Sequence, residues 1–211
     1  MNATTHATQL TSLENGAVMS RAEFHRLYEE CEGLRKVELI EGVVYMPSPE
    51  KFEQHSRQNT LLIGWLLAYQ DYRPGDVEAS VGGSILLDDE NEPIPDAMLF
   101  RLRPDRFEDG YVNGAPELII EIANTSVSRD LHQKKEAYRR NGVIEYIVWR
   151  VRDGEIDWFQ LRNGDYERRV PDPEGVIESE VFPGLRLDLS AALAIDRRRL
   201  LAAVRPPGES V

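Results

Sequence analysis

Residues 118–123 read Leu-Ile-Ile-Glu-Ile-Ala, a nearly continuous apolar run with one carboxylate, Glu121, inside it. A short apolar run of this kind is typical of a strand that is buried on both faces of a sheet. A carboxylate in such a strand is unfavourable unless it is paired or coordinates a metal ion. The stretch therefore predicts a sheet covered on both sides and a site at Glu121.

A second carboxylate lies in a similar setting upstream. Asp96 follows Pro95 at the start of the apolar run 94–100, which also predicts a strand. Two carboxylates on neighbouring strands would converge on one Mg²⁺ or Mn²⁺, because both are hard ions that prefer oxygen ligands. Such an ion activates water and stabilises charge on a phosphoryl group. Asp96 and Glu121 are therefore candidate metal ligands.

Apolar periodicity and turn signals predict the elements around these two strands. Ser20 and Glu23 form a capping box that begins a helix, and Asp153-Gly154 and Asn163-Gly164 mark the turns of a meander. Helices are predicted over residues 20–33, 51–72, 130–141 and 189–204, and strands over 37–46 (a hairpin), 77–81, 84–87, 94–100, 118–123, 145–151, 156–161, 166–170 and 185–187. Strands and helices that are interleaved in this way indicate an α/β protein.

The length and the apolar content indicate one domain. A chain of 211 residues with 41% hydrophobic residues fills one sizeable core. We expect a flexible arm over residues 1–19, a single domain over 20–204 and a flexible tail over 205–211.

The charge and the cysteine content restrict the function and the compartment. The net charge of −12, from 37 acidic and 25 basic residues, has the wrong sign for a protein that coats nucleic acid. It is compatible with an enzyme that gathers carboxylates around a cation, since the ion supplies positive charge.

Cys31, the only cysteine, forms no intramolecular disulfide, and the sequence contains neither a signal-peptide core nor an apolar window long enough to span a membrane. We expect a cytoplasmic protein without membrane contact.

The ordered motifs of the chain resemble the Uma2 family, also known as DUF820, which is grouped with the PD-(D/E)XK restriction-endonuclease-like proteins. The resemblance covers roughly residues 20 to 190. The motifs that carry it are Val37-Glu38-Leu39-Ile40-Glu41-Gly42, His55, Pro95-Asp96, Glu121-Ile122-Ala123 and Asp130-x3-Lys134-x3-Tyr138-x3-Gly142-Val143-x-Glu145-Tyr146. The resemblance implies an α/β core with a mixed sheet flanked by helices, to which this chain adds an N-terminal helix and hairpin and a C-terminal meander.

The same resemblance implies a ligand set. Asp96 and Glu121 would hold the metal ion, with the backbone carbonyl of Ile122 as a further ligand. The standard motif has lysine where this chain has Ala123, and Uma2-like sequences supply the lysine from the following helix, at Lys134. The neighbouring Lys135 is the alternative, and at most one of the two can face the metal because successive helical residues point about 100° apart.

Three further residues are candidates for the site. Glu38 or Glu41 would complete it, although both are also ordinary positions in a hairpin. His55, at the start of the long helix, is either a structural capping side chain or a neutral imidazole that acts near phosphate or metal.

The main hypothesis is a Mg²⁺-dependent (or Mn²⁺-dependent) endonuclease that acts on nucleic acid, on DNA rather than RNA. A homodimer fits this hypothesis, since cutting both strands of a duplex calls for two sites. The acidic balance and Ala123 motivate an alternative, a catalytically inactive nuclease-fold module that binds nucleic acid or protein. A structural homo-oligomer that joins through its meander is a third interpretation.

Overall fold

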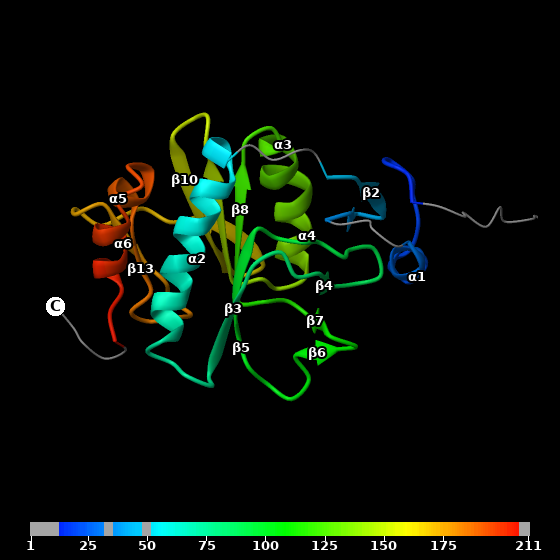
Figure 1. The fold of residues 1–211 in the computed structure, drawn as a ribbon, viewed down its shortest axis with the longest axis horizontal. Helices are drawn as coiled ribbons and strands as arrows, with labels where there is room; N and C mark the ends of the chain where they lie inside the picture. Colours follow the sequence, from blue (N-terminus) through cyan, green and yellow to red (C-terminus); the bar gives the residue numbers. More distant parts are fainter. Residues whose placement is uncertain (1–12, 32–35, 48–51, 207–211) are drawn as a thin grey trace, which may run out of the picture.

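A six-stranded mixed sheet forms the centre of the computed structural model, which describes residues 13–31, 36–47 and 52–206 (Figure 1). The strand order is β11-β10-β9-β8-β5-β3, and only β8 and β9 pair in parallel. The bounds are β3 Val77–Ser80, β5 Ala97–Arg101, β8 Leu118–Ala123, β9 Glu145–Arg150, β10 Glu155–Arg162 and β11 Asp165–Arg168. The parallel pair needs a crossover, which the helical segment between β8 and β9 provides.

Helices cover both faces of this sheet (Figure 1). Side chains alternate along β8, so Leu118, Ile120 and Ile122 pack towards α2 (Ser56–Gln70), which follows a short 3₁₀ turn, η1 (Phe52–Gln54). On the opposite face, Ile119 and Ala123 join the cluster that contains Tyr138 of α4 (Lys135–Arg140). The strand buried on both faces, the mixed sheet and the flanking helices are confirmed.

A separate apolar cluster joins the N-terminal helix and hairpin. Phe24 and Leu27 of α1 (Arg21–Glu30) pack with Leu39 and Val44 of the hairpin, β1 (Glu38–Ile40) and β2 (Val43–Tyr45). The hairpin turn has positive φ at both of its central residues, Glu41 and Gly42, as a tight two-residue turn requires. Of the predicted arm, residues 13–19 lie against β2, where Val18 bridges to Val43, while residues 1–12 lie outside the described residues.

Smaller elements complete the domain. Two short sheets are formed by β4 (Ile85–Leu86) with β7 (Tyr111–Asn113) and β6 (Phe107–Glu108), and by β12 (Val176–Glu178) with β13 (Arg186–Asp188). The sequence did not predict β6, β7 or β12, which are short and lie in segments rich in Asp, Glu and Gly, residues typical of turns. Over residues 13–31, 36–47 and 52–206, no helix is both long enough and apolar enough to cross a membrane.

The C-terminal helix is divided, which corrects the prediction of one helix over 189–204. It forms α5 (Leu189–Leu193) and α6 (Arg197–Ala203), and Ile195 between them has a φ of 54°. The side chains of Asp188 and Asp196 each accept a backbone N–H at the start of one helix. Two caps eight residues apart therefore begin two helices. Of the predicted tail, residues 207–211 lie outside the described residues, as do 32–33 of the first predicted helix and 51 of the second.

Candidate active site

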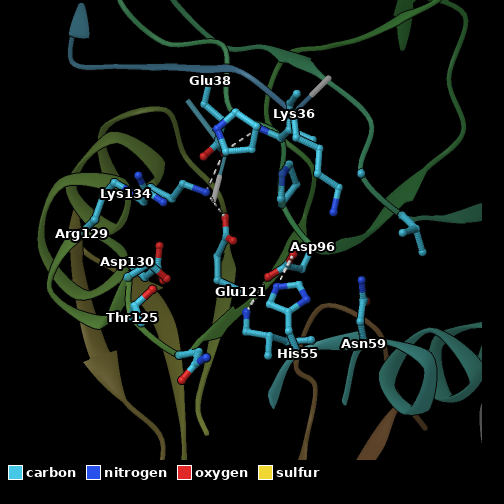
Figure 2. A pocket seen from close by; sticks show the side chains of 18 of the residues that line it. Lys36, Glu38, His55, Asn59, Asp96, Glu121, Thr125, Arg129, Asp130 and Lys134 are labelled. Carbon is cyan, nitrogen blue, oxygen red and sulfur yellow. Dashed lines mark hydrogen bonds and ion pairs between the residues drawn. The ribbon is translucent and has the colours of Figure 1, made fainter. Parts of the chain in front are cut away.

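Asp96 and Glu121 face the same side of the sheet. β5 and β8 are antiparallel, with Ala97 opposite Ile120, so extending this register by one residue places Asp96 opposite Glu121. Met98 is two residues from Asp96 and Ile119 is two residues from Glu121, so each points to the same face of the sheet as its acid. Both pack in the apolar cluster beneath α4. Both carboxylates line one cavity of about 150 Å³ (Figure 2). The two acids therefore meet at one pocket, as the sequence predicted.

Asp96 is held from two sides. One carboxylate oxygen, Oδ2, accepts the backbone N–H of Ile122 at 2.7 Å. The other, Oδ1, lies 3.0 Å from Nε2 of His55, which precedes α2 (Figure 2). His55 occupies the N-cap position, but its side chain makes no capping hydrogen bond. Its imidazole is therefore directed to Asp96 and not to the helix that it begins.

Glu121 accepts two hydrogen bonds from the helical segment above it. Lys134 Nζ and the Tyr138 hydroxyl both donate to Oε1, each at 2.9 Å. Lys134 and Tyr138 are four residues apart and so lie on one helix face. Burial raises the pKa of Glu121 well above its usual range, opposed by Lys134, while the nearby acids Asp130, Asp96 and Glu38 raise it further. This carboxylate is thus in a strongly acidic, water-poor environment.

Lys134 bridges two carboxylates. Its Nζ lies 2.7 Å from Glu38 Oε1 as well as 2.9 Å from Glu121 Oε1, and the residue is only 2% exposed (Figure 2). Burial alone would lower the pKa of Lys134, but the surrounding carboxylates outweigh that effect and raise it, so the lysine stays charged. Lys135 points elsewhere, with Nζ 3.6 Å from the centre of the Phe159 ring. The structure thus selects Lys134 as the lysine that faces the carboxylates.

The segment that carries Lys134 departs from a regular helix. The predicted helix over 130–141 begins earlier, at α3 (Val127–Arg129), and passes through one π-helical turn, η2 (Asp130–Lys134), before α4. Asp130 and Lys134, the two ends of this turn, are both buried and both line the cavity. Single π turns of this kind frequently occur at functional sites.

Asp130 is a site residue to which the sequence analysis gave no role. It is buried, lines the cavity, and accepts a hydrogen bond from the Ser126 hydroxyl. Burial raises its pKa, opposed by Lys134. The spacing of Ser126 and Asp130 is a local signal, but only the folded structure shows that this acid lines the pocket.

The two candidate glutamates of the hairpin, Glu38 and Glu41, have different surroundings. Glu38 lines the cavity, and its Oε1 also accepts the backbone N–H of Ile94 at 2.8 Å. Glu41, in the hairpin turn, instead forms a two-pronged ion pair with Arg140, at 2.6 and 2.9 Å. Its carboxylate is thus held outside the group of residues that line the cavity. The hairpin therefore contributes one of its two glutamates to the pocket.

The chemistry of the pocket suits a hard divalent cation. Among the buried charged groups of the cavity, three acids (Glu38, Glu121 and Asp130) face one base, Lys134. No group of three or more His, Cys, Asp and Glu side chains within the described ranges is close enough to hold a metal ion. Mg²⁺ does not need such a group, since it is usually bound through one or two carboxylates and keeps several waters. Two carboxylates in an acidic pocket therefore fit this ion.

Comparison with known proteins identifies the family of the chain. The model of the Uma2 family, described as "Putative restriction endonuclease", matches residues 21–190. The chain belongs to the Uma2 family. The match spans β1 to β13 and includes every candidate residue of the site, which confirms the resemblance in the sequence. The Uma2 description supports a hydrolytic nuclease.

A solved structure shares the Uma2 fold. The "putative nuclease belonging to DUF820" from Anabaena variabilis ATCC 29413 aligns with a TM-score of 0.61 at 19% sequence identity, over 83% of this chain and 99% of that chain. At this identity the similarity shows the fold alone. No curated protein matches the Uma2 chain.

Proposed function

We propose that this Uma2 protein is a metal-dependent endonuclease that hydrolyses phosphodiester bonds in DNA with Mg²⁺ or Mn²⁺. The observation that carries the proposal is the convergence of Asp96 and Glu121 in one cavity, with Lys134 Nζ 2.9 Å from the Glu121 carboxylate. Carboxylates that converge next to a lysine suit phosphoryl transfer, in which positioning and charge stabilisation supply most of the catalysis.

The residues divide into two roles in this proposal. Asp96, Glu121 and the carbonyl of Ile122 would hold the ion, which supplies an activated water and stabilises charge on the phosphate. His55 and the Ile122 N–H orient Asp96, and Tyr138 orients Glu121. Lys134 provides a positive charge for the phosphate oxygens, and Glu38 keeps its ammonium at the pocket.

A cleavage assay tests the proposal directly. Supercoiled plasmid DNA and single-stranded RNA would each be incubated with Mg²⁺, Mn²⁺ or EDTA. We expect nicked and linear DNA with either ion and no cleavage in EDTA. Cleavage of RNA alone would show that the protein is a ribonuclease and not a deoxyribonuclease. Absence of cleavage on both substrates, together with a melting temperature that neither ion changes, would contradict it.

Two cations at the pocket are proposed phosphate contacts. Lys36 and Arg129 both line the cavity and lie near the carboxylates (Figure 2). Each phosphate contact contributes roughly 0.9 to the slope of log affinity against log salt concentration. We expect the double variant Lys36→Ala/Arg129→Ala to bind duplex DNA more weakly and to lower this slope by up to about 2. Fluorescence anisotropy at several salt concentrations measures both effects.

A matched control distinguishes these contacts from a general loss of positive charge. Arg198 is exposed on α6, which follows the small β12–β13 sheet. Arg198→Ala should leave the salt slope unchanged. An equal fall in slope for both variants would mean that DNA binding is diffuse and not centred on the cavity.

The proposal includes a homodimer, because a duplex has two strands to cut. Light scattering of the full chain measures the assembly, and a monomer that only nicks plasmid DNA would remove the dimer from the proposal without affecting the chemistry.

One observation favours the second candidate, a binding module without catalysis. Ala123 occupies the position of the standard motif's lysine, and the lysine that the fold supplies instead is engaged by two carboxylates. DNA binding that needs no metal, and that persists in the variant Asp96→Ala/Glu121→Ala, would favour this module over the enzyme.

A further inference from the structure

The ammonium of Lys134 lies between two carboxylates that would otherwise repel each other. It contacts Glu38 at 2.7 Å and Glu121 at 2.9 Å, and both acids are less than 10% exposed. These acids belong to separate parts of the fold, since Glu38 lies in the N-terminal hairpin and Glu121 in the central sheet. A positive charge in this position therefore joins the hairpin to the sheet.

Among the described side chains that line the cavity, Lys134 is the buried base, whereas Lys36 and Arg129 are less buried. Asp130, on the same π turn, adds a third buried acid to the same wall of the cavity. Buried carboxylates without a counterion are strongly destabilising, so removal of the lysine would leave the pocket with uncompensated negative charge. The buried carboxylates therefore require a cation at the position of the Lys134 ammonium.

A divalent ion bound at Glu121 would compete with Lys134 for this carboxylate. Both are attracted to Glu121, and two positive charges a few Å apart repel each other strongly where water is scarce. The other contacts need not break: Tyr138 still donates to Glu121, and Glu38 accepts from the backbone of Ile94 as well as from the lysine. The two carboxylates would thus keep these contacts if a metal ion took the place of the ammonium at Glu121 alone.

We propose that Lys134 is the built-in counterion of the metal-free site, and that a divalent metal replaces it at Glu121 while Glu38 retains the lysine. This inference rests on the proposed metal-dependent function and adds to it the exchange between the two cations. Before the exchange, the lysine holds the acids together. After it, the ammonium is released from Glu121 and available to a phosphate.

Thermal melting of Lys134→Met in EDTA and in Mn²⁺ tests the exchange. In EDTA the variant should melt about 10 °C below the wild type, because it buries acids without a counterion. Mn²⁺ should restore most of this loss, so the metal-induced rise in melting temperature should be at least about twice that of the wild type. Calorimetric titration should show Mn²⁺ binding roughly 10-fold more tightly to Lys134→Met, since the competing charge is gone.

Two further variants serve as controls. Lys135→Met removes the adjacent lysine, which lies on Phe159, and should leave the Mn²⁺-induced rise and the Mn²⁺ affinity as in the wild type. The double variant Lys134→Met/Glu121→Gln removes one charge of each sign. In EDTA it should melt above Lys134→Met, and it should lose the response to Mn²⁺.

The outcomes separate this inference from the proposed function. Equal metal-induced rises and equal affinities in the wild type and Lys134→Met would overturn the exchange and leave a metal-dependent nuclease intact. No response to Mn²⁺ in either protein would overturn both. Should Lys134→Met be recovered folded only in the presence of Mn²⁺, the exchange is supported; if it fails to fold with and without the ion while the double variant folds, the exchange is overturned.

Discussion

Asp96→Asn is expected to reduce the rate of plasmid cleavage by roughly 10²- to 10³-fold, the loss typical of removing one group that stabilises the transition state. Asparagine has the shape of aspartate, and its carbonyl oxygen still accepts the N–H of Ile122, which Asp96 contacts at 2.7 Å. The substitution therefore removes the negative charge that a metal ion requires and preserves the packing. The initial rate of nicking at saturating Mg²⁺ measures the effect.

Asp109→Asn is the matched control for this variant. Asp109 is exposed, lies in the turn between β6 and β7, and has a φ of 49°, a conformation that asparagine tolerates well. Its rate of nicking should equal that of the wild type. Asp96→Asn with wild-type activity and an unchanged response to Mg²⁺ would exclude Asp96 as a ligand.

The second large effect concerns stability and arises at Arg106. This guanidinium is 0% exposed and donates to both oxygens of Glu117, at 3.0 and 3.2 Å. Glu117→Ala would take the carboxylate from the buried cation and leave it backbone carbonyls, such as that of Ala115, as acceptors. Breaking such a pair from one side costs about 3–5 kcal/mol. Because Glu117 itself is 13% exposed, we expect the lower end of this range, about 3 kcal/mol, in the free energy of unfolding.

Urea denaturation of Glu117→Ala measures this loss, and an exposed pair provides the control. Arg139 also donates two hydrogen bonds to one glutamate, Glu136, at 2.7 and 2.8 Å from Nη2 and Nε, but both side chains are in contact with solvent. Glu136→Ala should therefore cost less than about 1 kcal/mol. Similar losses in the two variants would show that burial does not determine the strength of the Arg106 pair.

The pattern of residues along the chain predicted the central part of the fold. The apolar run 118–123 is the buried strand β8, and the run after Pro95 is β5, because strands and their faces follow from the local alternation of side chains. The elements that the pattern missed are β6, β7 and β12, each of two or three residues. β6 and β12 pair with the strands that follow them, and β7 also pairs with β4. The break at Ile195 was also missed, although Asp188 and Asp196 cap the two resulting helices.

What the chain order by itself determined is that Glu121 lies inside a buried strand, that Asp96 begins another, and that a lysine follows on a helix. What only the tertiary structure decided is which side chains share the pocket. Lys134 and not Lys135 faces the acids, Glu38 lines the pocket while Glu41 pairs with Arg140, and Asp130 lines the same pocket. The physical reason is that hydrophobic periodicity is local, whereas the direction of a charged side chain depends on partners that are distant in sequence and on where the hairpin and the helix dock against the sheet.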